Sequence, residues 1–348
     1  DVGFTDTVYR FEKKLLDLGL SSPVCVNSAS SGLVIALKAL NVSAGDEVIL
    51  PRQTFIATGL AVLEVGATPV FCDIDIKTGS LDLESVKKLL TEKTRAIIYV
   101  HWGGIGTNAY EFLELTKRYR IGLIEDAAHA FGAEIKKGKK LGSIDDKNHF
   151  VVFSFQAIKF FSTGDGGCIC SHPDHLSDLK ALSWFGINRD EKQIRRKLSQ
   201  ETGLNVTLKG FKYNMNAIQA SIGLANLRDL NHRIDLRRKR AKTLYEATQE
   251  NNKLVSMING VGQLELGIFW FFPILCHSKH EFIEYLTGHN IPSSTIDFRI
   301  DVNPIFKNHP KDRGVMQGEF DRKFLALSIC DHIPNHEITR FTEILRNY

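Results

Sequence analysis

The feature that most constrains this 348-residue chain is an alternation of short apolar runs with helical stretches in its first half. Each run is only three to six residues long, which is typical of a buried strand. Between several of them, at 83–90 and 110–119, apolar residues recur at helical spacing. This alternation predicts an α/β fold with a mostly parallel central sheet and flanking helices. The apolar runs are 48–50, 68–72, 96–100, 122–125, 150–155 and 167–170.

The length of the chain favours two domains, because it exceeds the usual size of one hydrophobic core. From Ala217 a helical pattern continues past Tyr245, and the segment 267–276 then predicts a strand in a different context. We place the boundary inside that long helical pattern. The prediction is a large domain at 1–230 and a smaller C-terminal α+β domain at 231–348.

Composition indicates a folded protein without identifying it. Hydrophobic residues make up 43% of the chain, which is ordinary for a globular protein. No apolar run approaches the length of a membrane span, and we expect no membrane association or signal peptide. Six cysteines are scattered at 25, 72, 168, 170, 276 and 330, which favours reduced thiols in a cytoplasmic enzyme and gives no pattern for a metal site.

Charge gives little reason to expect a nucleic-acid partner. The formal net charge is only +4. The one basic cluster lies at 232–240, where it could attract phosphates. However, the apolar residues Leu227, Leu230, Ile234 and Leu244 recur around it at helical spacing. We therefore interpret the cluster as the solvated face of a long helix.

Lys159 is the first candidate for chemistry. It lies in an apolar segment that continues into a glycine-rich turn at 164–167. An amine removed from water is more often the neutral nucleophile that condenses with an aldehyde. The alternative is a surface lysine whose ammonium group extends from an apolar segment into water.

Asp126 is the second candidate. It follows a short apolar strand, at the carboxyl edge of the predicted sheet, where ligands of α/β proteins bind. A carboxylate held there in a low dielectric needs a cationic or hydrogen-bonding partner, and a protonated pyridine nitrogen is such a partner. The alternative is that Asp126 or Glu125 caps a following helix.

Both candidates lie in motifs that resemble those of the DegT/StrS aminotransferases. The family pattern Glu-Asp-Ala-Ala-His-Ala matches 125–130, and Ser-Phe-x-x-x-Lys with Thr-Gly-Asp-Gly-Gly matches 154–159 and 163–167. Further matches lie at 45–49, 54–58, 66–73 and 212–215, so the resemblance covers nearly the whole chain. It implies a pyridoxal-phosphate-dependent transferase of fold type I. Members usually begin earlier than Asp1, with a segment ahead of this point.

The resemblance also implies roles for individual residues. Lys159 would form the Schiff base with pyridoxal 5'-phosphate and later move the proton during transamination. Asp126 would pair with the pyridine nitrogen. Phe55 would stack on the cofactor ring, and His129 would pack near it. Ser154 would bind the phosphate.

Other positions of this chain match functional positions of the family, some of them with a different residue. The small-residue turn that binds phosphate in the family is usually Ser-Gly-Thr, and here Ala29 replaces the glycine while Ser30 keeps a hydroxyl in the threonine position. Asn214 resembles the asparagine that reaches the phosphate of the neighbouring subunit, which implies a homodimer with shared active sites; an ordinary turn is the alternative. Arg189 is a candidate for a substrate phosphate or donor carboxylate, or for an ion pair with its acidic neighbours.

The function implied is transamination. An amino-acid donor, L-glutamate by analogy with the family, would convert the cofactor to pyridoxamine 5'-phosphate, which then aminates a keto group of a nucleotide-linked deoxysugar for amino-sugar biosynthesis. One alternative is a sugar dehydratase of the same fold, but relatives of that kind replace the lysine with histidine. The other is a non-catalytic regulator that binds the cofactor, and the intact Lys159, Asp126 and Ser154 argue against it.

Overall fold

A computed structural model describes residues 6–187, 206, 208–258, 260–296 and 299–348. Arg189 lies outside the described residues, and the structure does not bear on its predicted role. In the part of the chain that is described, no helix is both long enough and apolar enough to cross a membrane.

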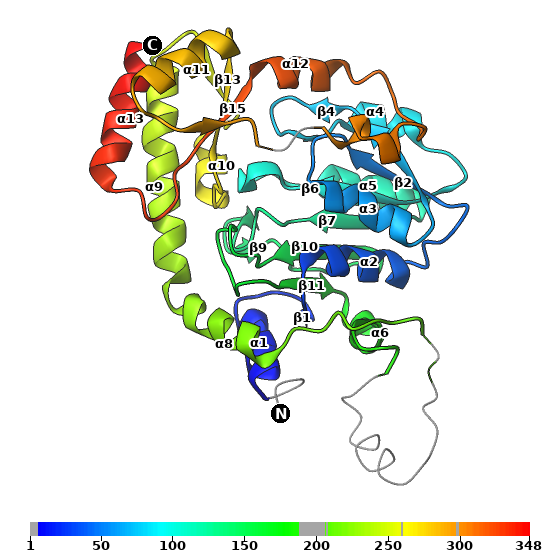
Figure 1. The fold of residues 1–348 in the computed structure, drawn as a ribbon. Coiled ribbons are helices and arrows are strands. Elements are labelled where there is room, and N and C mark those ends of the chain that lie inside the picture. The colour runs from blue at the N-terminus through cyan, green and yellow to red at the C-terminus, as the bar shows by residue number, and fades with distance from the viewer. Residues whose placement is uncertain (1–5, 188–205, 207, 259, 297–298) are drawn as a thin grey trace.

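A seven-stranded sheet forms the centre of the larger part of the molecule (Figure 1). Its strand order is β1-β11-β10-β7-β6-β2-β3. The five strands from β10 to β3 are parallel, and only β11 runs in the opposite direction. The strands are β1 (Val24–Val26), β2 (Glu47–Pro51), β3 (Thr68–Cys72), β6 (Thr94–Val100), β7 (Gly122–Asp126), β10 (His149–Ser154) and β11 (Gly167–Ser171). The predicted mostly parallel sheet is confirmed.

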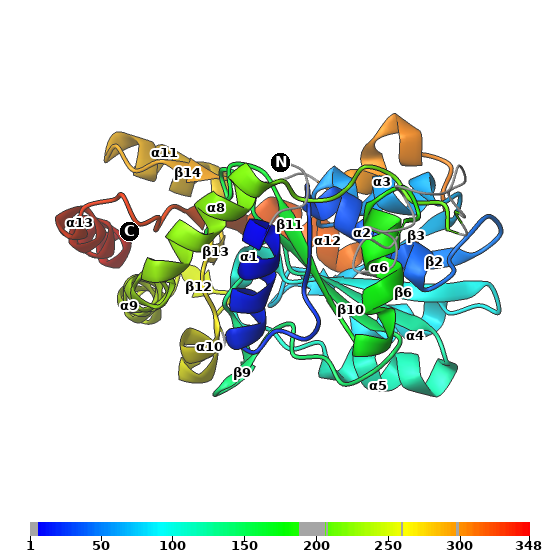
Figure 2. The same ribbon diagram turned by 90° about the horizontal axis from the view of Figure 1, so that it is seen from below.

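Helices cover both faces of this sheet (Figure 2). Successive residues of a strand point to opposite faces, so Val48 packs beneath α2 and α3 while Ile49 packs beneath α4 and α5. Burial on both faces explains the continuous apolar runs of the sequence. The flanking helices are α1 (Asp6–Asp17), α2 (Ala29–Ala39), α3 (Ile56–Glu64), α4 (Leu83–Leu89), α5 (Tyr110–Tyr119), α6 (Leu176–Ser183) and α8 (Ala217–Asn226). Two hairpins, β4 (Ile74–Asp75) with β5 (Ser80–Leu81) and β8 (Glu134–Lys136) with β9 (Lys139–Lys140), lie outside the sheet.

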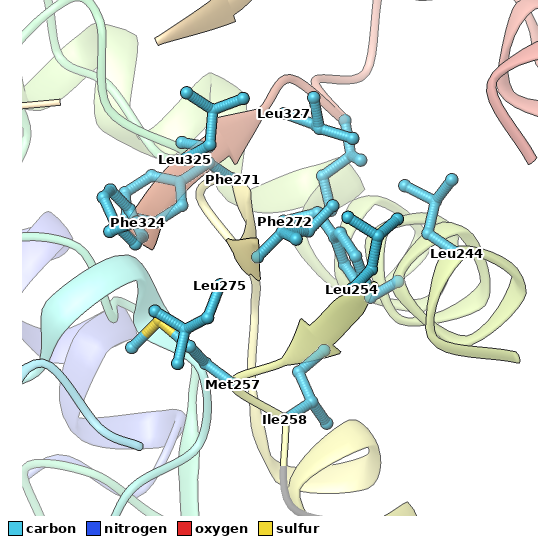
Figure 3. Packing of buried hydrophobic residues seen from close by; sticks show 14 of the residues in the cluster. Leu244, Leu254, Met257, Ile258, Phe271, Phe272, Leu275, Phe324, Leu325 and Leu327 are labelled. Atoms are coloured by element: carbon cyan, nitrogen blue, oxygen red, sulfur yellow. The ribbon is translucent and has the colours of Figure 1, made fainter. Parts of the chain in front are cut away.

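The C-terminal part contains a four-stranded antiparallel sheet with the order β12-β13-β15-β14. Its apolar face packs on the long helix α9, and Figure 3 shows Leu244 of that helix beside Leu254 and Phe272 of the sheet. This α+β arrangement agrees with the predicted fold, and the boundary at residue 230 stays a prediction. The elements are α9 (Leu230–Gln249), β12 (Leu254–Ser256), α10 (Val261–Leu266), β13 (Phe272–Cys276), α11 (Lys279–Gly288), β14 (Ser293–Ser294), α12 (Val315–Lys323), β15 (Phe324–Leu327) and α13 (Asn335–Asn347).

The basic cluster at 232–240 lies on α9, as expected, but its interpretation as a solvated face is wrong in part. Arg237 and Arg240 are each only 4% exposed. Arg237 donates hydrogen bonds to the carbonyl oxygens of Phe269 and Trp270, both at 3.0 Å, and Arg240 donates to the carbonyl of Ile333 at 2.6 Å. These guanidinium groups satisfy backbone carbonyls that would otherwise be buried without a donor. Helical spacing alone does not show that arginines have such partners.

A buried ion cluster ties the C-terminal segment to the end of β2. Arg52 is fully buried and pairs with Asp301 at 3.1 Å and with Asp312. Asp301 also accepts two hydrogen bonds from Arg299, each at 2.7 Å. Because Arg52 precedes the segment 54–58, the cluster fixes the position of a loop that forms one wall of the site described next.

Candidate active site

The ends of three parallel strands surround a cavity of about 370 Å³, here called the strand-end cavity. Val100, Asp126 and Ser154 are the last residues of β6, β7 and β10, and all three line it. The start of α2 and the turn before α3 form the other walls. Seven of the nine residues predicted for the site line this one cavity, namely Ala29, Ser30, Phe55, Asp126, His129, Ser154 and Lys159.

Asp126 is buried at the bottom of the cavity, with only 6% of its surface exposed. Its carboxylate accepts hydrogen bonds from the Thr58 hydroxyl at 2.8 Å and from the Ala128 backbone N–H at 3.2 Å. Burial raises the pKa of Asp126 above its ordinary value, although these hydrogen bonds act in the opposite direction. The residues that follow form turns, so helix capping does not explain Asp126. The site therefore holds a buried carboxylate whose charged form is disfavoured by burial.

Thr58 and Thr54 are polar contacts that sequence reasoning missed. The two hydroxyls lie 2.7 Å apart, and the Thr58 hydroxyl donates a hydrogen bond to the Asp126 carboxylate. Both threonines are buried and belong to the segment 54–58, which was recognised as a motif without roles for its hydroxyls. Two threonines four residues apart, one just before the start of α3 and one in its first turn, would have been the signal.

Glu125 supports the cavity from the other face of the same strand. It accepts hydrogen bonds from His101 at 2.5 Å and from His149. Burial by itself would raise the pKa of Glu125, but the two histidine hydrogen bonds outweigh it and lower the pKa to about 2. Since His101 follows β6 and His149 begins β10, this carboxylate links three neighbouring strands.

His129 forms a side wall of the cavity and is 5% exposed. Its Nδ1 accepts a hydrogen bond from the Gly103 backbone N–H at 3.3 Å. Burial, together with the charge of Lys159, lowers the pKa of His129 well below its ordinary value, so the ring is neutral near physiological pH. The ring packs against Trp270, with centroids 4.2 Å apart.

Lys159 lies where the strand-end cavity meets the C-terminal part of the molecule. Its Nζ is 4.0 Å from the centroid of the Trp270 ring, and the Trp270 Nε1–H donates to the Ile158 carbonyl at 2.9 Å. The hydrogen bond to the Ile158 carbonyl therefore fixes the Trp270 indole. The Lys159 amine lies over the face of this ring in a cation–π contact. Sequence reasoning missed Trp270, because nothing near position 270 indicates contact with position 159.

The start of α2 forms the polar end of the cavity. Ser28 caps this helix, and its hydroxyl accepts a hydrogen bond from the Ser31 backbone N–H at 3.2 Å. Ala29 and Ser30 follow as the first helical residues and line the cavity. Backbone N–H groups at a helix start favour an anion such as a phosphate. Phe55 also lines the cavity and is 56% exposed.

Asn214 is buried but does not line the strand-end cavity of its own chain. Its Nδ2 donates to the Met215 carbonyl at 3.0 Å, and its backbone pairs with Val26. The predicted role of Asn214 in a neighbouring subunit stays a prediction. Among the described residues, no group of three or more histidine, cysteine, aspartate or glutamate side chains is arranged to hold a metal ion.

Comparison with known proteins identifies the family. The sequence pattern of the DegT/DnrJ/EryC1/StrS aminotransferase family matches residues 4–346. The chain belongs to this aminotransferase family. An uncharacterized protein of Methanocaldococcus jannaschii is 34% identical over 313 residues, covering 87% of this chain and 78% of that protein. GDP-perosamine synthase of Caulobacter vibrioides is 29% identical over 350 residues, covering 92% of this chain and 89% of the synthase.

The fold of this family member agrees with solved structures. The crystal structure of AtS13 from Actinomadura melliaura matches it with a TM-score of 0.89 and 27% identity, covering 100% of this chain and 92% of that one. The predicted fold, that of the type I transferases, is therefore confirmed. The chain is an aminotransferase by family, and the roles of its individual residues stay predictions.

The histidine pair around Glu125 predicts a dependence of stability on pH. The pKa of Glu125 is about 2 in the folded protein, which is below its unfolded value. The contribution of Glu125 to the stability of the folded protein is thus present above its pKa in the unfolded chain. It is lost as the pH falls toward its pKa in the folded protein. Glu125→Gln should lower the free energy of unfolding at pH 7 by on the order of 3 kcal/mol, and by much less near pH 3.

Urea unfolding of the unaltered protein and of the Glu125→Gln variant between pH 3 and pH 7 measures the difference in their free energies of unfolding. Glu84→Gln is a matched control, because Glu84 lies on the surface and its ion pair with Lys87 is exposed. If Glu125→Gln lowers the free energy of unfolding by the same amount from pH 3 to pH 7, the pKa of Glu125 is not lowered in the folded protein and the prediction is wrong.

Proposed function

We propose that this protein uses pyridoxal 5'-phosphate to transfer an amino group from an amino acid, L-glutamate, to a keto group of a nucleotide-linked deoxysugar. The observation that carries the proposal is the arrangement of Lys159, Asp126 and the start of α2 around one cavity. Its volume of about 370 Å³ lies within the usual range of small-molecule sites.

The residues of the cavity fit the cofactor group by group. The buried carboxylate of Asp126, whose pKa is raised by burial, suits a protonated pyridine nitrogen. The N–H groups at Ala29 and Ser30, with the Ser154 hydroxyl, suit a phosphate dianion. The exposed ring of Phe55 and the neutral ring of His129 offer flat surfaces for the pyridine ring.

Different residues of the cavity have different roles in the proposed reaction. When bound, pyridoxal phosphate supplies an electron sink for the carbanion at the α-carbon of the donor. Asp126 keeps the proton on the ring nitrogen, and the hydrogen bond from Thr58 favours the charged form of Asp126. Lys159, held against the Trp270 ring, moves the proton at the α-carbon of the donor.

The proposal that the substrate is a nucleotide-linked sugar rests on the names of relatives and not on the shape of the cavity. The synthase at 29% identity carries the name of a GDP-linked sugar, which favours a nucleotide-linked acceptor here. The lysine at 159 favours transamination over dehydration, because a freed amine is needed to move the proton.

Lys159 should carry the cofactor. Protein incubated with pyridoxal phosphate should turn yellow, and borohydride should then attach the cofactor covalently to Lys159, since this amine faces the cavity that fits the phosphate and ring. Absorbance spectra and peptide mapping by mass spectrometry measure both results. Lys159→Arg should remain colourless, whereas Lys212→Arg, at a lysine outside the cavity, should behave as the unaltered protein. Label spread equally over several lysines would sink the proposal.

The unaltered protein should convert nucleotide-linked keto sugars only when L-glutamate is present. A panel that varies the nucleotide and the position of the keto group, scored by mass spectrometry for the aminated sugar and for 2-oxoglutarate, measures this. Asp126→Ala should slow the reaction with glutamate by about 100-fold, because the ring nitrogen loses its anionic partner. If 2-oxoglutarate forms without any aminated sugar in the panel, the donor is right and the proposed acceptor class is wrong.

We also propose a homodimer with shared active sites. Apolar side chains are exposed around the strand-end cavity and near Asn214, as if another surface covered them. Ile158 on the cavity wall is 66% exposed, and Ile218 and Phe211 are 63% and 46% exposed. Exposed apolar side chains that form one patch mark a surface that binds a partner. A second copy that covers this region would bring Asn214 toward the phosphate end of its neighbour's cavity.

Mixing two inactive variants tests the shared site. In a hybrid of Lys159→Ala and Asn214→Ala subunits, one cavity keeps its lysine and receives the intact asparagine of the other subunit. Refolding an equal mixture should therefore restore about a quarter of the activity of the unaltered protein. Each variant refolded alone gives the baseline. If Asn214 acts in its own chain, the mixture stays at that baseline.

A further inference from the structure

A second cavity of about 570 Å³ lies beside the strand-end cavity, between the segment 157–159 and the C-terminal part of the chain. We call it the basic cavity. Ile158, Lys159 and Trp270 line both cavities, so they form the boundary between them. A molecule in the basic cavity would thus lie next to the amine of Lys159.

The charges that line the basic cavity do not balance. Lys159, Arg233 and Arg237 are cationic, and Asp331 is the single carboxylate among the described lining residues. Asp331 pairs with Arg233 at 2.5 Å and with Arg237 at 2.7 Å, so both of its oxygens are engaged. Positive charge in a partly buried site favours an anionic ligand.

The two guanidinium groups hold residues on either side of the Lys159 amine. Arg233 donates through Nη2 to the carbonyl of Phe160, the residue after Lys159. Arg237 donates through Nη1 to the carbonyl of Trp270, whose ring contacts the Lys159 amine. An anion bound at these arginines would therefore lie close to the amine rather than at a distant surface.

Of the two arginines, Arg233 is the one that a ligand can reach. Its side chain is 26% exposed, compared with 5% for Arg237. Arg233 donates through Nε to Asp331 and through Nη2 to the Phe160 carbonyl, and its partly exposed side chain lines the basic cavity. A guanidinium with an accessible edge suits a carboxylate.

We propose that the basic cavity receives the amino-acid donor and that Arg233 binds one of its carboxylates. This inference rests on the proposed transaminase function and names the place of its donor. The remaining lining fits such a molecule. Apolar side chains from Ile296 and Leu327 suit its methylene groups, and the hydroxyls of Ser293 and Ser328 suit a second carboxylate.

A carboxylate fits this place better than the diphosphate of the sugar substrate. The α-carboxylate of an amino acid is one bond from the carbon that reacts, so it must lie near the Lys159 amine. In a nucleotide-linked sugar, the sugar ring separates the diphosphate from the reacting carbonyl. Arg233 contacts the residue next to Lys159, which matches the shorter separation.

Binding of glutarate, a dicarboxylate that cannot react, tests the inference without turnover. Isothermal titration calorimetry on the full chain saturated with pyridoxal phosphate should show that Arg233→Gln weakens glutarate binding by about 10- to 100-fold, the loss expected for a charged hydrogen bond. Arg233→Lys keeps the positive charge but lacks the planar guanidinium group. Its affinity for glutarate should lie between those of the unaltered protein and the Arg233→Gln variant.

Arg238→Gln is the matched control. Arg238 lies on the same helix, contacts the carbonyl of Gly267 at 2.9 Å and does not line the basic cavity. Its variant should bind glutarate as the unaltered protein does. Equal glutarate affinity in the Arg233→Gln and Arg238→Gln proteins would overturn the inference and would leave the proposed transamination untouched.

Titration with guanosine, uridine and thymidine diphosphates separates the two kinds of anion. If Arg233→Gln weakens the binding of a diphosphate and not that of glutarate, the cavity takes the sugar substrate and the donor assignment is wrong. Ser294→Asp adds a negative charge on the opposite wall without altering α9, so it should also weaken glutarate binding. Kinetically, Arg233→Gln should raise KM for glutamate while KM for the sugar stays unchanged.

Discussion

The rest of the site depends on one constraint, the burial of the Asp126 carboxylate at the end of a central strand. An ionised carboxylate in a low dielectric is costly unless cations or hydrogen-bond donors surround it. Thr58 and the Ala128 N–H supply two donors, yet burial still raises the pKa of Asp126. In the function proposed above, a pyridinium nitrogen would favour the charged form of this carboxylate, and the neutral His129 beside it would add no competing charge.

The boundary between the two parts of the molecule is built around a single aromatic residue. Trp270 comes from the segment just before β13, yet its ring contacts Lys159 and His129 of the larger part. Arg237 of α9 holds the backbone of Trp270 through its carbonyl. The position of the amine thus depends on packing between distant segments. This geometry also divides the interior into a cavity suited to a cofactor and a basic cavity suited to an anionic substrate.

Sequence reasoning recovered those parts of the fold and site that follow from local pattern. The parallel sheet was predictable because strands buried on both faces are continuously apolar. Asp126 was predictable as a cavity residue because it ends such a strand, and the ends of parallel strands meet at one edge, whereas Ser154 was predicted from the family resemblance. The arginines of α9 were misjudged, because helical spacing indicates which residues share a face but not whether a charged side chain reaches a buried carbonyl.

By itself the sequence determined the chemistry available to this protein: a lysine in an apolar segment, a carboxylate at a strand end and a turn of small residues that resembles the family's phosphate-binding turn, in an order that resembles one family. Only the tertiary structure decided which groups surround them. Thr58 lies 68 positions from Asp126, and Trp270 lies 111 positions from Lys159, although both pairs are in contact. Contacts over such separations arise from the packing of whole elements, and no local pattern encodes them. The basic cavity has the same origin, since its cations come from two distant segments, the one around Lys159 and helix α9, which meet only in the folded protein.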